Sequence, residues 1–444
     1  MNKIFNDSAW NLFSQVIPAF TALFSIPLII KTGGIEIFGV ITLVWALVNF
    51  TGILDFGISK VLTKEIAENS DDLRKLKIVS FVGVFMITLI GTLISLLIFC
   101  SQNLIIDSIF FDSSFDRIEL SNLILIVSIT SFTVCLSNGL RGILEGYQMF
   151  RFVAFIRTPA AVWAFMSPLI VLPFTSNLAL LILPLALGRF AVCMIYLYKI
   201  SQMGLISFKI SNLNLEQVKS FFNYGAFIAL SNLISPIMFT MDRFLVAQIT
   251  GSNNIAYYST PQEIVIKFLM IPTSIARALF PAMAKNNSFA NKNLDILPWN
   301  ILLLITLFFL SIVILICYQA FSFFINVEFA DEVSNIFKIL CIGMFFVSMA
   351  QIPFSSLQAR GRARITAILH CFELPFFLFF LFKLTKLYGY EGAAIVWAAR
   401  CCIDAFLMTL FDSIMINNPK VFRIRFLSLI FGSIFLSFLL YITY

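Results

Sequence analysis

Long apolar runs alternate with short polar segments along almost the whole chain. Thirteen runs are long enough to cross the ~30 Å hydrocarbon core of a bilayer, which takes about 20 residues as an α-helix. The predicted spans are 10–30, 37–58, 78–100, 120–140, 152–174, 177–198, 221–249, 256–281, 298–325, 333–356, 365–388, 392–414 and 424–443. The pattern therefore predicts an all-α, polytopic membrane protein.

Composition agrees with this pattern. Of 444 residues, 60% are hydrophobic and 12% are charged, and 52 are phenylalanine. Soluble domains carry about 25% charged residues, so a large soluble domain is not expected. The polar segment before the first span is short and no small-residue cleavage site follows it, so we expect that span to be retained.

Cysteine and histidine give no sign of a metal or cofactor site. The eight cysteines show no CxxC or Cys/His spacing, and we expect them to be small core residues. The one histidine, His370, lies in a predicted span, where packing or hydrogen bonding is the favoured role over catalysis.

The distribution of Lys and Arg predicts the orientation. With a cytoplasmic N-terminus, the inner segments and their edges, Arg423 and Arg425 included, hold 20 basic residues and the outer segments hold 4. This is the bias expected of inner loops, and it alternates without a break. The net charge of +7 is therefore mostly topological and does not indicate a nucleic-acid partner.

Two pairs of similar stretches suggest an internal duplication. NLFSQVIPAF (Asn11–Phe20) resembles NLISPIMF (Asn232–Phe239), and GYQMFRFVAFIRTP (Gly146–Pro159) resembles GRARITAILHCFELP (Gly361–Pro375). The shift predicts two six-helix lobes, 1–200 and 221–414, joined by a cytoplasmic linker, 201–220; residues 415–444 form a turn and a thirteenth span. Chance similarity between apolar helices is the alternative. Parallel repeats with a substrate site at their interface are a transporter architecture.

Charged residues inside the spans are the candidate functional residues. Asp242 and Arg243 interrupt the apolar run 221–249, where a charge costs roughly 2.5–3.5 kcal/mol on insertion scales and should face protein or water. They form either a neutralised ion pair between helices or part of a polar pathway. Further candidates are Asp55 near the end of span 2, Arg157 near the inner edge of span 5 and Glu373 in span 11.

Two further charge pairs have the four-residue spacing that places side chains on one helix face. They are Glu263 with Lys267 in span 8, and Arg400 with Asp404 in span 12. A structural and a functional role are equally open for both pairs.

Enzyme chemistry finds little support in this sequence. No HExxH, DxD, GxSxG or P-loop pattern occurs, and no large loop is available for a catalytic site. No filter loop of a selective channel is evident either. A carrier with a charged interior remains, and we expect no catalytic residues.

An ordered set of stretches resembles the Wzx-type O-antigen and polysaccharide-repeat flippases of the multidrug/oligosaccharidyl-lipid/polysaccharide (MOP) exporter superfamily. The resemblance covers most of residues 1–412 and departs from the usual twelve-helix core at span 424–443. The stretches are FGVITLVWALVNFTGILDFGISKVLTKEIA (Phe38–Ala67), RGILEGYQMFRFVAFIRTP (Arg141–Pro159), YGAFIALSNLISPIMFTMDRFLV (Tyr224–Val246), AYYSTPQE (Ala256–Glu263), LFPAM (Leu279–Met283), QARGRARITAILHCFELP (Gln358–Pro375) and YGYEGAAIVWAAR (Tyr388–Arg400).

This resemblance implies a V-shaped pair of lobes and the transfer of undecaprenyl-pyrophosphate-linked oligosaccharide across the bacterial inner membrane. It implies a cation site, for H⁺ or Na⁺, to which Asp242, Glu373 and Asp404 are the candidate contributors. Arginines pair two phosphate oxygens at once, so Arg157, Arg243 and Arg400 are the candidates for the pyrophosphate. A polysaccharide polymerase and a chain-length regulator are candidate partners, beside membrane lipid.

Two other functions stay open. A multidrug efflux carrier of the same superfamily would share the fold and the cation coupling, but would need an aromatic, anionic pocket for organic cations. A non-transporting scaffold of a glycan-assembly complex is the other alternative, although a scaffold has no need of buried charges.

Overall fold

The computed structural model describes residues 2–52, 54, 58–68, 72–204, 238, 240–285, 296–416 and 418–442, with backbone only for 2–15 and for eleven further positions. Every regular element in these ranges is a helix, which confirms the predicted all-α class. The chain divides into two compact units, Met1–Thr240 with Gly251–Asn253, and Met241–Thr250 with Asn254–Tyr444. The predicted boundary at 200 falls within α7 (Leu178–Gln202), whereas the boundary at 220 lies outside the described residues.

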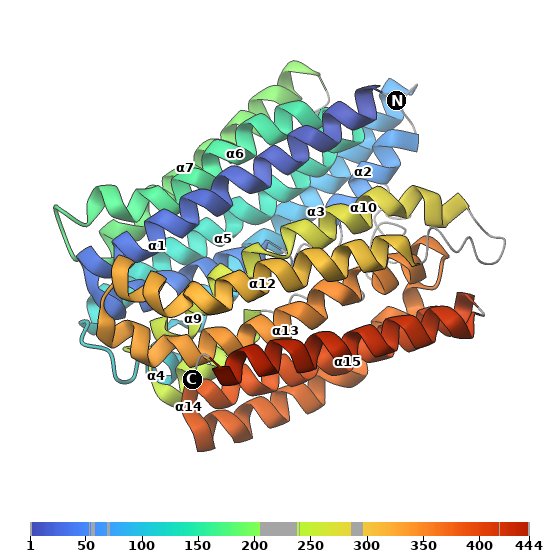
Figure 1. Cartoon of the computed structure of the whole chain (residues 1–444). Coiled ribbons are helices and arrows are strands. Elements are labelled where there is room, and N and C mark those ends of the chain that lie inside the picture. Colours follow the sequence, from blue (N-terminus) through green and yellow to red (C-terminus); the bar gives the residue numbers. More distant parts are fainter. Residues whose placement is uncertain are drawn as a thin grey trace. The chain divides into compact units, whose positions relative to one another are not determined.

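Unit 1 is built around one buried helix, α5 (Arg117–Gly146), which packs against α2, α3 and α7 (Figure 1). The other helices of the unit are α1 (Asn2–Thr51), α2 (Ile58–Glu68), α3 (Leu73–Cys100), α4 (Gln102–Ile109), α6 (Phe150–Val171) and α7 (Leu178–Gln202). The loop Gly251–Asn253 also belongs to this unit, since Asp112 Oδ1 accepts a 2.8 Å hydrogen bond from the Ser252 backbone N–H.

Glycine allows α2 to approach α5 closely. A Cβ at Gly142 would collide with the backbone oxygen of Ser59, so no larger residue fits without a shift. The close approach also lets the Thr63 hydroxyl donate a 3.0 Å hydrogen bond to the Gly142 carbonyl. Small residues are the usual means of close helix packing in membranes.

Unit 2 is also built around one buried helix, α13 (Val327–Ala359). It contacts α9 (Ala256–Lys267), α10 (Met270–Lys285), α12 (Leu297–Phe324), α14 (Ala363–Ile416) and α15 (Pro419–Ile442). The helices α5 and α13 are the most buried of the candidate membrane spans in the described chain. They are the fourth and tenth predicted spans, which are equivalent positions under the predicted duplication.

Nine of the described helices are long and apolar enough to span a membrane, and two of them each contain two predicted spans. In α1 and α14 the helix is interrupted at Gly34 (φ 86°) and Gly389 (φ 59°), a backbone conformation that costs glycine little. Span 8 corresponds to α9 and α10 together. Span 7 lies largely outside the described residues, which include helix 240–250. The chain is therefore a multi-pass membrane protein.

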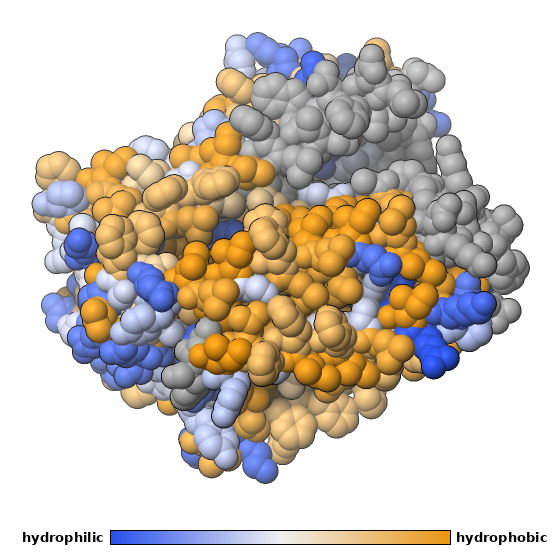
Figure 2. Space-filling view, in the orientation of Figure 1, coloured by the Kyte–Doolittle hydropathy of each residue, from blue (hydrophilic) through white to orange (hydrophobic). Residues whose placement is uncertain are grey.

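Large hydrophobic side chains are exposed along these helices. Phe308, Phe379 and Phe431 are each more than 60% exposed. Hydrophobic residues also form a broad area across the middle of the face shown in Figure 2. Exposed apolar surface of this extent is the surface that lipid covers in a membrane protein.

Candidate functional site

Asp242 is fully buried in unit 2, and both of its oxygens are hydrogen-bonded. Helix 240–250 places it against α9, where Tyr258 and Gln262 lie four residues apart and thus on one face. The Tyr258 hydroxyl donates to Asp242 Oδ2 at 2.8 Å, and the Gln262 amide donates to the same oxygen. The backbone N–H of Arg243 donates to Oδ1 at 2.9 Å. The carboxylate is thus held as a hydrogen-bond acceptor by three protein donors.

Arg243 extends this network along α9. Its guanidinium donates through Nη1 to Glu263 Oε1 at 2.6 Å and through Nε to Gln262. Glu263 Oε2 lies 3.1 Å from Lys267 Nζ, so the four-residue pair expected from the sequence is present. We name Asp242, Arg243, Tyr258, Gln262, Glu263 and Lys267 the α9 network. Its charges, two acidic and two basic, balance.

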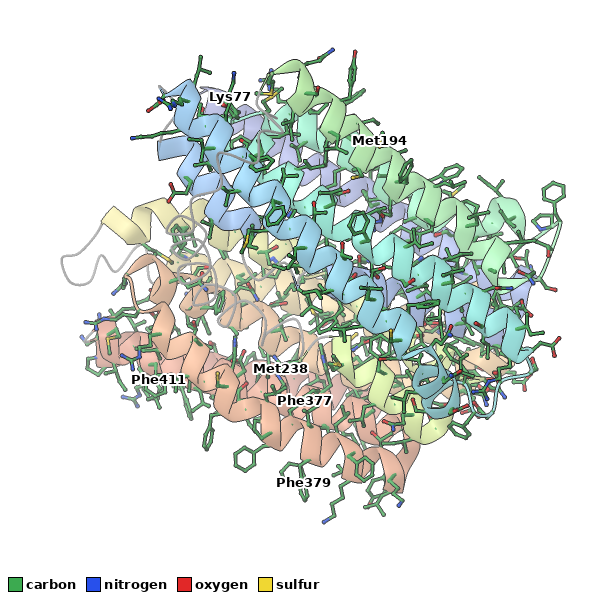
Figure 3. The ribbon with its side chains drawn as sticks, turned by 180° about the vertical axis from the view of Figure 1, so that it is seen from behind. Lys77, Met194, Met238, Phe377, Phe379 and Phe411 are labelled. Atoms are coloured by element: carbon green, nitrogen blue, oxygen red, sulfur yellow. The ribbon has the colours of Figure 1, made fainter. Side chains whose placement is uncertain are left out.

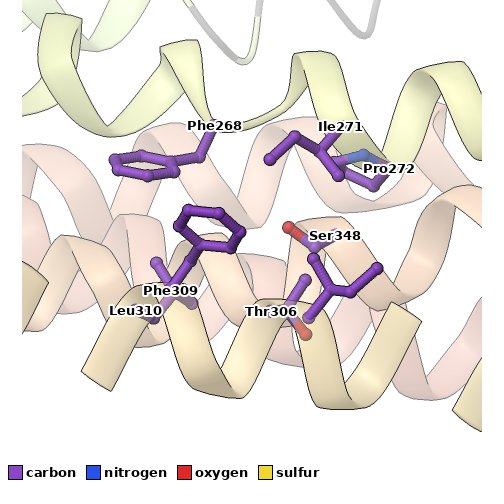
Figure 4. Close-up of a pocket in the computed structure, with 8 residues that line it drawn as sticks. Phe268, Ile271, Pro272, Thr306, Phe309, Leu310 and Ser348 are labelled. Carbon is purple, nitrogen blue, oxygen red and sulfur yellow. The ribbon is translucent and has the colours of Figure 1, made fainter. Parts of the chain in front are cut away.

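Lys267 is the last residue of α9, and the chain bends directly after it. Pro272 has no N–H to bond the carbonyl of Phe268 four residues earlier, so the helix stops and α10 starts at Met270. Beside the bend is a small pocket of about 10 Å³ lined by Phe268, Pro272, Thr306, Phe309 and Ser348 among others (Figure 4). This volume is close to the minimum for one water molecule, so the pocket is not a substrate site.

A second group of charges lies within α14, on both sides of the interruption at Gly389. His370 and Glu373 come from its first half and Arg400 and Asp404 from its second half, and all four are at most 7% exposed. His370 Nε2 lies 3.3 Å from Asp404 Oδ1. The guanidinium carbon of Arg400 lies 5.8 Å from the centre of the Phe377 ring. We name these four residues the α14 cluster.

Glu373 differs from the other acidic residues of unit 2. Both of its oxygens are buried, and neither has a hydrogen-bond partner among the residues that the structure describes. It lines a groove of about 460 Å³ between the two halves of α14, together with Arg400 and ten apolar residues. Phe377, 3% exposed, forms part of the floor, whereas Phe379, two residues on, projects away from the helix (Figure 3).

Cys401 connects the α9 network with the α14 cluster. Its thiol is fully buried and lies within electrostatic range of Asp242, Glu373, Arg400 and Asp404. The structure therefore brings together five of the predicted site residues in one helical unit around α9 and α14, with Glu263 and Lys267 at one end. Among the described residues, no group of three His, Cys, Asp or Glu side chains has a metal-binding arrangement.

The remaining two predicted site residues belong to unit 1. Arg157 is an exposed residue of α6. It lies within electrostatic range of Tyr196 on α7, as do Arg141, Arg189 and Glu145. Arg141 Nε is 3.4 Å from Glu145 Oε1. Asp55 lies outside the described residues.

Several polar residues of these sites carry little or no signal in the sequence. Tyr258 and Gln262 are neutral, and their only signal is the four-residue spacing within AYYSTPQE. Arg425, one of the charges expected at the inner edge, is fully buried in the protein. Its Nη1 donates to Asp412 Oδ2 at 2.6 Å, and its guanidinium carbon lies 5.1 Å from the Trp299 ring. A partner on α14 thus compensates the charge of Arg425, which the sequence did not reveal.

Comparisons with known proteins agree with this architecture. Residues 4–287 match the family model described as polysaccharide biosynthesis protein. A Shigella flexneri protein named "Putative O-antigen transporter" is 31% identical over 413 residues, which cover 91% of this chain and 97% of that protein.

Two groups of solved structures share the fold. The lipid II flippase MurJ in an inward closed conformation has a TM-score of 0.73 at 14% identity, covering 98% of this chain and 99% of its own. An inward-facing multidrug resistance MATE family transporter of the MOP superfamily has a TM-score of 0.70 at 14% identity, covering 93% and 94%.

These relatives are transporters and flippases, which confirms the prediction that the chain is not an enzyme. The fold is that of the MOP superfamily, as the resemblance implied. By the family match and the Shigella relative together, the chain belongs to the polysaccharide biosynthesis protein family, among its O-antigen transporter-like members.

Proposed function

We propose that this protein moves undecaprenyl-pyrophosphate-linked O-antigen or related polysaccharide repeat units from the inner to the outer leaflet of the bacterial inner membrane. The observation that carries the proposal is the 31% identity to the Shigella O-antigen transporter-like protein over nearly the whole of both chains. The N-terminus is cytoplasmic in this proposal, as the distribution of Lys and Arg predicts.

The physical task explains why such a protein needs charges inside its spans. A glycan and a pyrophosphate cannot cross hydrocarbon unaided, because each polar group without a partner costs several kcal/mol. The lipid tail has no such difficulty and can remain in the bilayer. A carrier therefore has to supply polar partners for the head group while it leaves the tail in lipid.

We propose Arg157, Arg243 and Arg400 as the pyrophosphate-binding arginines, because a guanidinium can pair two phosphate oxygens. The three differ in how accessible they are in this conformation. Arg157 is exposed, whereas Arg243 and Arg400 are 4% and 6% exposed. Arg157 is therefore the residue that can meet the head group without a rearrangement, and the other two would meet it in another arrangement of unit 2.

Cation coupling is the second part of the proposal, with Asp242, Glu373 and Asp404 as the candidate residues. The hydrogen bonds that each side chain accepts distinguish Asp242 from Glu373. Asp242 already accepts three hydrogen bonds from protein groups. Glu373 accepts none from the described residues. The α14 cluster is thus the better candidate for the coupling cation, because an unpartnered buried carboxylate is stabilised by binding a positive charge.

A complementation series tests the function. The gene is deleted in its own host, and the wild-type protein and the variants Arg157→Ala, Arg243→Ala and Arg400→Ala are expressed at matched membrane levels. We expect wild type to restore the surface polysaccharide and each variant to lower it, with lipid-linked repeat units accumulating in the inner leaflet. Arg362→Ala, at an exposed position, is the matched control and should restore export fully. Full export by all three variants would contradict the cationic binding site.

The same strains discriminate the two alternatives. A multidrug efflux carrier would leave the polysaccharide unchanged on deletion and raise the sensitivity of the cell to organic cations. A scaffold would be needed for assembly, yet substitutions of its buried charges that preserve folding would leave export intact.

A further inference from the structure

We propose that a groove between α10 and α13 binds uncharged sugar rings of the glycan, an inference that rests on the proposed transport of a lipid-linked oligosaccharide. The groove lies within unit 2, and its volume of about 410 Å³ is in the range of small-molecule sites. Its lining residues are Thr273, Ala276, Phe280, Gln351, Phe354, Ser355 and Gln358. We name it the α10–α13 groove.

A stripe of polar side chains on α13 forms one wall of the groove. Gln351, Ser355 and Gln358 are spaced by four and three residues, so they share one face of the helix. Phe354 lies on the same face, between two of them. The stripe is unusual because α13 is the most buried of the candidate membrane spans in the described chain.

The polar side chains of this stripe lack partners within the protein. Gln351, Ser355 and Gln358 are each only partly exposed, and none of the three side chains makes a hydrogen bond to another residue that the structure describes. A polar group inside a membrane span is costly unless something bonds it. Two amides and a hydroxyl therefore need partners that the described part of the chain does not supply.

The chemistry of these groups matches a sugar. An amide offers N–H donors and an oxygen acceptor side by side, and a serine hydroxyl offers one of each. Neighbouring hydroxyls on a sugar ring also donate and accept, so one ring can bond both parts of a glutamine amide. None of the seven lining residues carries a charge. The groove is therefore suited neither to a phosphate nor to an organic cation, which needs an anionic, aromatic pocket.

Two phenylalanines supply the apolar contacts that a sugar ring also requires. Phe280 on α10 is 39% exposed, and Phe354 on α13 is partly exposed. The ring of Phe354 stacks on the His370 ring with centroids 6.1 Å apart, which fixes its orientation. A pyranose ring carries C–H bonds on its faces and hydroxyls at its rim. An aromatic face can pack on the former while the amides bond the latter.

The groove begins at one end of the membrane span. Gln358 is the next-to-last residue of α13, and Gln351 lies eight residues before the last one, which is about 12 Å of helix. With the proposed cytoplasmic N-terminus, this end of α13 faces the cytoplasm. The groove is therefore on the side from which the glycan enters, and it assists loading of the head group.

A comparison of two lipids tests the groove. The protein is purified, placed in phosphatidylcholine nanodiscs, and titrated with lipid-linked repeat units extracted from the deletion strain or with undecaprenyl pyrophosphate that carries no sugar. We expect wild type to bind the sugar-bearing probe more tightly. Gln351→Leu and Gln358→Leu should each weaken this binding about 2- to 13-fold, the loss of one net hydrogen bond, and leave the affinity for the bare lipid unchanged.

The matched control is Gln319→Leu, at an exposed position of α12 outside the groove, which should bind both probes as wild type does. Without probes, Gln351→Leu and Gln358→Leu should unfold at the wild-type Tm, because neither amide bonds a described residue. A lowered Tm would mean that the amides hold the fold, which would overturn the proposal. Equal affinity of wild type for the two probes would overturn it as well, and so would equal losses for both probes in the variants.

The titrations need no translocation, so the two proposals can fail separately. A protein that prefers the sugar-bearing probe but does not restore polysaccharide export would refute the flippase function and leave the groove in place. A protein that restores export without this preference would refute the groove alone.

Discussion

Replacing Arg425 by Met is expected to destabilise unit 2 strongly. Arg425 and Asp412 are both fully buried and their charged atoms lie 2.6 Å apart. Removal of one partner leaves the other as an uncompensated buried charge, which costs about 3–5 kcal/mol. Loss of the contact with the Trp299 ring adds about 0.5–2 kcal/mol.

The double variant Arg425→Met/Asp412→Leu should recover most of this loss. The second oxygen of Asp412, Oδ1, has no hydrogen-bond partner among the described residues. The ion pair therefore recovers only part of the free energy that is lost when its two charges leave water. Apolar replacements of similar size are often neutral or stabilising at such pairs. We therefore expect the double variant within about 2 kcal/mol of wild type, with a coupling free energy of at least about 3 kcal/mol.

Thermal unfolding of purified protein in one detergent measures the effect. For a unit of this size, 1 kcal/mol shifts Tm by about 2–4 °C, so the combined loss of about 3.5–7 kcal/mol in Arg425→Met should lower Tm by about 7–28 °C. The double variant should return to within about 8 °C of wild type. If the losses of the two single variants simply add in the double variant, the two charges do not stabilise each other and the reasoning is refuted.

Two further predictions concern the packing of each unit. Tyr258→Phe removes one hydrogen-bond donor from the buried Asp242 and should lower the free energy of unfolding by about 1.5–3 kcal/mol. The control Tyr257→Phe, at a less buried neighbouring position, should cost little. Equal Tm values for the two variants would contradict the role of Tyr258. Gly142→Ala should push α2 away from α5 at a cost of about 1–3 kcal/mol, which limited proteolysis of unit 1 would detect. Gly91→Ala, whose Cβ would lie 3.2 Å from the side chain of Cys135, should destabilise the unit less than Gly142→Ala. A larger loss of stability in Gly91→Ala than in Gly142→Ala would contradict the packing argument.

The positions of the helices were predictable from the sequence because hydropathy is a local property. A run of apolar residues has to be a helix in lipid whatever its neighbours are. The breaks at Gly34 and Gly389 agree with the short gaps between predicted spans. The pair Glu263–Lys267 was predictable because residues four positions apart lie on the same face of a helix, which is also a local property.

Contacts between helices were not predictable in the same way. His370 and Asp404 are 34 positions apart in the sequence and lie in two different predicted spans, and no periodicity connects them. Arg425 lies near the start of its span, where an arginine is ordinarily placed at the membrane edge. Whether it faces water or a buried aspartate depends on how α15 packs on α14, which hydropathy does not determine.

The anchoring of α15 has a practical consequence for topology mapping. Reporter enzymes are commonly fused behind successive spans, and a fusion placed between α14 and α15 would delete Arg425 while it keeps Asp412. The truncated protein would carry a lone acid near the end of its last helix, without the arginine that pairs with it, and the cell would degrade or misinsert it. Sandwich fusions, which retain the residues after the insertion point, avoid this artefact.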